Sequence, residues 1–138
     1  SNALFDHAYG VDVCYDEMMI AGEGDEGEQM AKAMSSGNPM GGDNLPQPGE
    51  GPSKESREKG NYDILFFADL EEKSIEARVT GDMDPGYGST SKMIAESALC
   101  LVQDCPDLAG GIYTPAPSMG EKLIDRLIKK AGLTFDIV

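Results

Sequence analysis

The sequence contains no tryptophan, one histidine and 3 cysteines among its 138 residues. Zinc sites built from cysteine and histidine need grouped ligands, and the chain has neither a Cys-x-x-Cys pair nor a second histidine beside His7. We therefore expect no metal site. We interpret Cys14, Cys100 and Cys105 as buried free thiols, with a reactive cysteine as the less favoured alternative. No spacing singles out a catalytic acid, base or nucleophile.

Basic residues are also scarce, since 11 lysines and arginines stand against 25 aspartates and glutamates, for a net charge of −14. We find no basic face in any segment, which excludes nucleic acid and anionic lipid surfaces as expected partners. No apolar run approaches the ~20 residues of a membrane span, and no basic and apolar leader is visible. These absences predict a cytoplasmic protein without membrane association.

The length favours one compact domain covering residues 1–138. Residues 35–60 concentrate glycine, proline, serine and charge, which predicts a flexible linker of about that extent. The first residues, Ser1-Asn2-Ala3, are either a tag remnant or native sequence. We expect the chain to be a fragment of a longer protein.

Apolar alternation predicts three strands in the body of the chain and one near its start. Residues 62–68 and 75–79 have alternating apolar side chains and are expected to form a hairpin, with the first strand inside the sheet because it is apolar on both sides. Residues 133–138 predict a terminal strand, and residues 9–15 another.

Three segments have the pattern of helices. Residues 28–34 predict a short helix, and residues 90–104 are apolar nearly all round, which indicates a buried helix. A third helix is predicted from a capping box at Ser118 and Glu121 to a left-handed cap at Gly132. The fold class is therefore α+β, with a mixed, largely antiparallel sheet and helices packed on one face.

Two glycine- or proline-rich turns precede the later helices, and both are rich in small hydroxyl residues. Helix starts expose free backbone N–H groups, so the two turns together are candidates to receive an anionic or polar group. A purely structural turn is an equal alternative, and Lys92 pairing with Glu96 is favoured over a catalytic Lys92. The candidate substrate-binding residues are Asp84, Gly86, Tyr87, Gly88, Ser89, Thr90, Lys92, Thr114 and Ser118.

The chain also contains a literal G-x-G-x-x-G dinucleotide pattern in Gly22-Glu23-Gly24-Asp25-Glu26-Gly27. Its intervening residues are all acids, which would repel a pyrophosphate, and no strand–turn–helix unit surrounds it. The Gly86–Lys92 segment is not a phosphate-binding loop either, because Ser91 stands where a glycine should precede the lysine. We predict no cofactor-binding residue in this chain.

Several segments carry a family resemblance: LPQPGEGPSKE at 45–55, GDMDPGYGSTSKM at 81–93, AESALCL at 95–101 and GGIYTP at 110–115. In this order they resemble the C-terminal part of the saccharopine dehydrogenase-like oxidoreductases, including the trans-acting enoyl reductase branch. Residues 1–20 are similar too. The resemblance departs around residues 30–45, where such proteins tend to have a longer and more apolar connection.

The resemblance implies the C-terminal, substrate-side domain of an NAD(P)-dependent oxidoreductase whose N-terminal Rossmann domain is not in this chain. NAD or NADP would be bound by that domain, so the chain alone is expected to be inactive and to hold no cofactor. A small-molecule substrate and a homodimer are the implied partners. The alternative is a non-catalytic acidic interaction or dimerisation module.

Overall fold

The computed structural model describes residues 1–37, 49–70 and 73–138, and its described residues fall into two compact units. One unit comprises Ser1–Gly10 and Pro52–Val138, and the other comprises Val11–Gly51. The predicted linker at 35–60 lies in part outside the described residues.

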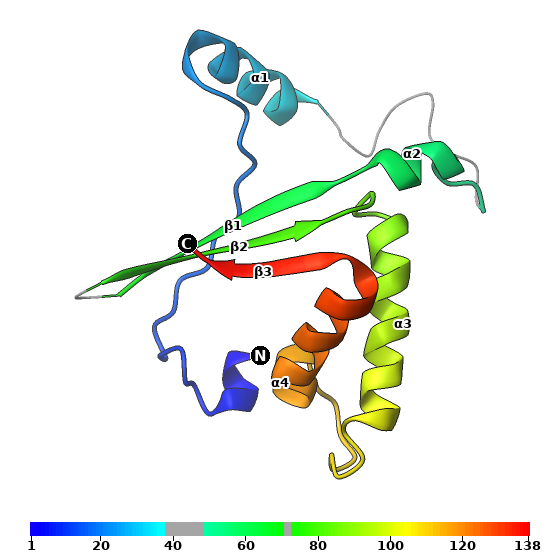
Figure 1. Cartoon of the computed structure of the whole chain (residues 1–138). Helices are drawn as coiled ribbons and strands as arrows, with labels where there is room; N and C mark the ends of the chain where they lie inside the picture. Colours follow the sequence, from blue (N-terminus) through cyan, green and yellow to red (C-terminus); the bar gives the residue numbers. More distant parts are fainter. Residues whose placement is uncertain (38–48, 71–72) are drawn as a thin grey trace. The chain divides into compact units, whose positions relative to one another are not determined.

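The larger unit is built on an antiparallel sheet of three strands in the order β1-β2-β3 (Figure 1). They are β1 (Tyr62–Asp69), β2 (Ser74–Gly81) and β3 (Leu133–Ile137). Ile64 pairs with Val79 and Val79 with Phe135, so these three side chains share one face. The predicted hairpin and terminal strand are confirmed, and so is the α+β class. The described sheet is antiparallel throughout.

The position of β1 in the sheet differs from the prediction. We expected β1 inside the sheet, but it is an edge strand, and β2 is central. The reason lies in the later helices, which bring the chain back along the free side of β2 instead of that of β1. The apolar side chains of β1 therefore stay partly open, with Phe66 45% and Phe67 66% exposed.

The predicted strand at residues 9–15 is absent. The chain instead begins with a short 3-10 helix, η1 (Asn2–Phe5), and Val11 is 78% exposed. Asn2 forms local bonds to the backbone of Tyr9 and Gly10, and Gly10 adopts φ +91°. Tyr9 and Gly10 are thus held in local turns, and in the described structure the alternating side chains of residues 11–15 find no partner strand.

Helices fill the segments before and after the hairpin. The smaller unit contains α1 (Gly24–Ser36), which confirms and extends the predicted helix at 28–34. α2 (Lys54–Lys59) lies within the predicted linker and corrects that part of it, because the Ser53 hydroxyl accepts a bond from the Ser56 N–H and caps the turn.

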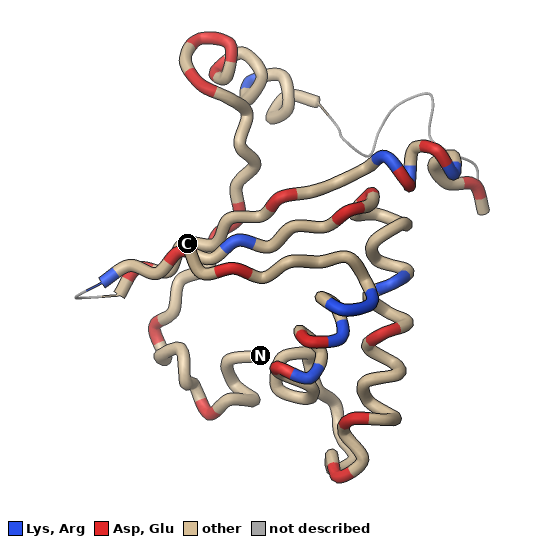
Figure 2. The backbone as a smooth tube through the Cα atoms, viewed as in Figure 1, with Lys and Arg blue, Asp and Glu red and all other residues tan. Residues whose placement is uncertain are grey.

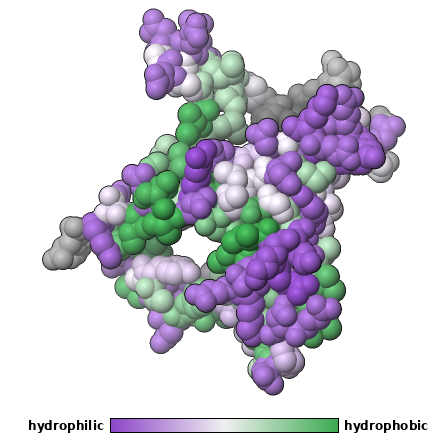
Figure 3. All heavy atoms as spheres, in the orientation of Figure 1, coloured by the Kyte–Doolittle hydropathy of each residue, from purple (hydrophilic) through white to green (hydrophobic). Residues whose placement is uncertain are grey.

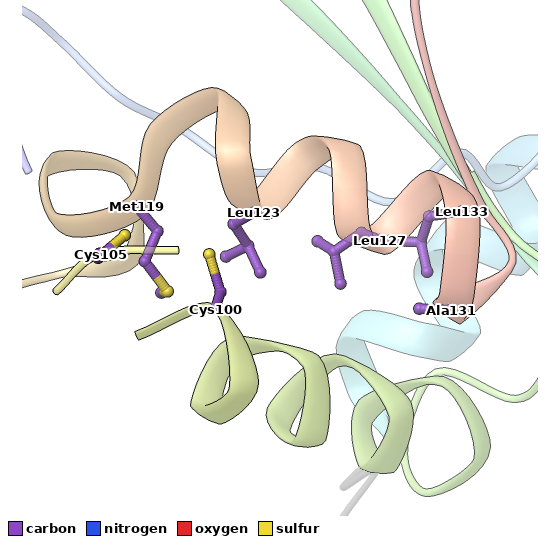
Figure 4. Packing of buried hydrophobic residues seen from close by; sticks show 7 residues of the cluster. All are labelled: Cys100, Cys105, Met119, Leu123, Leu127, Ala131 and Leu133. Carbon is purple, nitrogen blue, oxygen red and sulfur yellow. The ribbon is translucent and has the colours of Figure 1, made fainter. Parts of the chain in front are cut away.

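The core lies between two later helices and the start of β3. They are α3 (Gly88–Gln103) and α4 (Pro115–Arg126), and α4 continues into a π-helical turn, η2 (Leu127–Ala131). Gly132 then adopts φ +74°, which confirms the predicted left-handed cap. The buried side chains form one row, which Figure 4 shows: Cys100, Cys105, Met119, Leu123, Leu127, Ala131 and Leu133.

Two details of these helices correct the sequence analysis. α3 is not buried all round, since Ile94 is 68% and Val102 78% exposed, because α4 and η2 cover only one of its sides. Ser118 is not the N-cap of α4, because its hydroxyl donates to the Thr114 and Pro115 carbonyls inside the first turn. Among the described residues, no helix is long and apolar enough to cross a membrane.

Candidate functional site

The loop before α3 is organised by the carboxylate of Asp84. Its Oδ1 accepts the backbone N–H groups of Gly86 at 3.0 Å and Tyr87 at 3.2 Å, and its Oδ2 accepts that of Gly88 at 2.5 Å. The pKa of Asp84 is lowered, first by the bond from Gly88 and further by the Tyr87 and Gly86 amides and the charge of Arg57. The aspartate is thus held in its ionised form.

This arrangement favours one of the two alternatives that the sequence left open for the first turn. The N–H groups that we expected to receive a ligand already bind a carboxylate of the same chain. The geometry therefore favours a structural turn at Gly86 and Gly88. Tyr87, which is 56% exposed, and Thr90 stay at the surface of this loop, so their role as substrate contacts remains a prediction.

Two other candidates from this loop have partners of their own. The Ser89 side chain is fully buried, and its hydroxyl lies 2.9 Å from that of Tyr62 on β1. Lys92 donates to Asp82 Oδ1 at 2.7 Å, so the predicted pair with Glu96 does not form. Both contacts tie α3 to the sheet and the preceding loop.

The second pair of candidates lies at the other end of the helix pair. α3 and α4 run antiparallel (Figure 1), so the Asp84 loop adjoins the end of η2, where Gly132 packs on the Asp82 carboxyl group. Met119, next to Ser118, instead packs with Cys100 and Cys105 at the far end of α3. A helix of 16 residues is about 24 Å long, so the two helix starts do not form one site.

An apolar recess of about 410 Å³ lies at this second turn. Its lining is mostly aliphatic and includes Gly110 and Gly111. Tyr113 and Ser118 bring hydroxyl groups to it, whereas Thr114 is not among its lining residues and bonds the Ser1 hydroxyl at 2.8 Å. The apolar lining consists of Leu101, Leu108, Ala109, Pro115 and Met119. Of the predicted site residues, Ser118 alone lines this recess.

The structure also gathers basic side chains that the sequence analysis missed. Lys122, Arg126, Lys129 and Lys130 border a recess of about 500 Å³ along α4 and η2. Figure 2 shows the positions of Lys and Arg in blue along this helix, with Asp and Glu in red between some of them. Their spacing of three and four residues along one helix was the available signal. Because Asp104 and Asp125 line the same recess, the expectation that no segment has a basic face stays a prediction for this helix.

Arg126 in this recess forms ion pairs with acidic neighbours. Its Nε donates to Glu96 Oε2 at 2.9 Å and its NH1 group to Asp104 Oδ2 at 2.8 Å. Lys122 donates to the backbone carbonyl of Asp104. The positive charge is thus largely compensated within the fold, and its main effect is to fasten α4 to the end of α3.

Two of the three cysteines are buried, as expected, whereas Cys14 is exposed. The pKa of the Cys100 thiol is raised, chiefly by burial and then by neighbouring Cys105. A raised pKa keeps the thiol protonated, so it is a poor nucleophile. No cluster able to hold a metal ion occurs among the residues that the structure describes.

We expect Asp84→Asn to lower the Tm by about 3–8 °C at pH 7, because the amide weakens the cap at the start of α3. The carboxylate stabilises the fold only while it is ionised. Since its pKa is lower in the folded chain, the difference between the two proteins should be full above pH 5 and shrink as the pH falls through that lowered pKa. Circular dichroism melts from pH 7 down to 3 measure this.

Asp107→Asn is the control for this prediction, because Asp107 is an exposed aspartate of the same unit. Its melting temperature should match that of the unchanged protein across the series. An Asp84→Asn difference that stays constant with pH would show that the charge of Asp84 is not what holds the loop.

Comparison with known proteins gives sequence relatives alone. A Mycobacterium tuberculosis (strain H37Rv) protein is 35% identical over 150 residues. Its name describes it, provisionally, as a trans-acting enoyl reductase. Proteins named trans-acting enoyl reductase from Mycobacterium ulcerans and Mycobacterium bovis (strain BCG) are 32% and 30% identical over 146 residues. No family model and no solved structure matches the chain.

The matches cover nearly all of this chain but a smaller share of each relative. Each covers 92% of this chain but 35% of the relative. The chain thus spans about a third of the length of the curated relatives it matches, and the names of those relatives describe oxidoreductases.

Proposed function

We propose that this chain is the C-terminal substrate-binding and dimerisation domain of a saccharopine dehydrogenase-like, NAD(P)-dependent oxidoreductase, and that it is not catalytic by itself. The observation that carries the proposal is the match over 92% of the chain to proteins named for enoyl reduction, of which it spans only 35%. Most of such a protein lies outside this sequence, and we assign the reductive chemistry to that part.

The substrate we propose is a small molecule with an enoyl group, as the names of the relatives indicate. The apolar recess beside α4 supports a binding role, because its aliphatic lining suits a hydrocarbon portion. The Tyr113 hydroxyl is the side-chain donor available there to orient a carbonyl oxygen, because the Ser118 hydroxyl already donates to the Thr114 and Pro115 carbonyls. Tyr87, Thr90 and Lys92 remain candidates for contacts at the other helix start.

The nicotinamide cofactor of such a reductase does not fit the glycine pattern of this chain. Gly24 opens α1, with Glu23 as its N-cap residue and Asp25 and Glu26 in its first turn. These carboxylates stand where a pyrophosphate would need backbone N–H groups and positive potential. We therefore assign cofactor binding to the remaining part of the protein.

Titrating the longer protein and this chain separately with NADH and NADPH tests the proposal. Nicotinamide fluorescence should respond to the longer protein and not to the chain alone, and the tighter of the two ligands identifies the cofactor. A longer protein that binds neither nucleotide would favour a non-catalytic acidic interaction module. Binding by this chain alone would overturn both interpretations.

A further inference from the structure

The outer edge of β1 is an exposed apolar strand edge. In the part of the chain that the structure describes, β1 pairs with β2 alone, so the backbone groups along its other side have no strand partner. Five successive apolar residues, 64–68, lie along this edge. Leu65 is 43% and Phe67 66% exposed, and such an edge is a template for pairing with another strand.

The sheet face that carries the core is also covered at one end only. At the Tyr62 end, Ser89 of α3 bonds the Tyr62 hydroxyl, and Leu133 is buried among the helices. Toward the opposite end of the same face, Phe66 is 45% and Ile137 77% exposed. Figure 3 shows hydrophobic atoms at the surface around the C-terminal end of the sheet.

We infer that a second copy of this chain pairs antiparallel along β1, around a two-fold axis at Leu65, to make one continuous sheet of six strands. The inference rests on the dimerisation part of the proposed function and names its interface. In this dimer the uncovered apolar part of each copy's sheet would lie next to the other copy.

The register follows from symmetry and charge. In an antiparallel pair opposite residues point to the same face, so a two-fold axis perpendicular to the sheet must pass through a residue position. An axis at Phe66 would set Asp63 opposite Asp69 of the other copy, which is repulsive. An axis at Leu65 sets Asp63 opposite Phe67 and overlaps residues 62–68 of both strands.

The same symmetry explains why a second copy fits the uncovered face. Because the strands run in opposite directions, the Tyr62 end of one copy lies beside the Ala68 end of the other. The helix layer of each copy packs at its own Tyr62 end and on the same face of the sheet. Each helix layer would therefore stand next to the apolar part that the other copy leaves open.

Charge at the interface is compatible with this pairing. Asp63 is bound by Arg78 of the neighbouring strand, which compensates its charge near the edge. The net charge of −14 on each copy opposes association at long range. Raising the salt concentration should therefore strengthen the dimer.

Disulfide trapping tests the interface. In a Cys14→Ser background, which removes the exposed native thiol, Leu65→Cys places two thiols at the axis. Directly opposite residues of an antiparallel pair are about 4.5–5.5 Å apart at Cα, which suits a disulfide. Mild oxidation should convert most of the protein to a covalent dimer on a non-reducing gel, and sedimentation of the unoxidised protein should give a dimer mass.

Phe67→Cys in the same background is the matched control. In the inferred register the two copies of residue 67 are about 14 Å apart along the strands, beyond the reach of a disulfide. Equal trapping at both positions would contradict the register, and a monomer at high protein and salt concentration would overturn the interface. Neither result depends on nicotinamide binding, so failure here is distinct from failure of the proposed oxidoreductase role.

Discussion

Leu127→Ala is expected to lower the free energy of unfolding by about 2–5 kcal/mol, the usual range for removing a buried leucine side chain. Leu127 is 7% exposed and stands in the middle of the row of core residues, between Leu123 and Leu133 (Figure 4). The small core of this domain has few other side chains to close the cavity. Equilibrium urea unfolding followed by circular dichroism measures the loss.

Ile128→Ala is the control for that experiment, because it removes an aliphatic side chain of the same size from the next position. Ile128 is 46% exposed, so its truncation should cost less than about 1 kcal/mol. Similar losses at the two positions would show that the side of the helix facing the core is wrongly assigned.

The second large effect is expected for Gly60→Ala, which should lower the free energy of unfolding by about 1–3 kcal/mol through overpacking. A methyl group at Gly60 would lie 2.6 Å from the backbone nitrogen and Cα of Asp84. These are backbone atoms of a loop held by its own bonds, including one from the Asp84 N–H to the Arg57 carbonyl. They have little freedom to move away.

The backbone angles of Gly60, φ −64° and ψ 156°, are open to any residue, so the cost is steric and not conformational. Gly110→Ala is the control, since a methyl group there would meet no atom within 4 Å. Urea unfolding should leave Gly110→Ala within about 0.5 kcal/mol of the unchanged protein. If Gly60→Ala behaves in the same way, the contact between α2 and the Asp84 loop is looser than the structure has it.

The candidate site could be predicted only in part. A helix start in a sequence predicts free backbone N–H groups that need a partner, but it does not identify that partner. For Gly86 and Gly88 the partner is Asp84, four residues or fewer away, and this local cap was visible in the sequence as readily as a ligand site. The separation of Ser118 from the Asp84 loop was not visible, since it follows from the antiparallel packing of α3 and α4. The pairing of Arg126 with Glu96, 30 residues away, is likewise a tertiary contact.

The sequence by itself determined the α+β class, the hairpin, the α3 and α4 segments and the cap at Gly132, because these depend on apolar periodicity and local backbone preference. Tertiary structure alone decided that β1 lies at the edge, that α3 has one open side and that residues 9–15 form no strand. The physical reason is that a strand or a buried helix side exists only through its neighbours. The periodicity of β1 is the same at the edge of a sheet as in its middle, and the return of the chain to β2 is set by how α3, α4 and η2 pack.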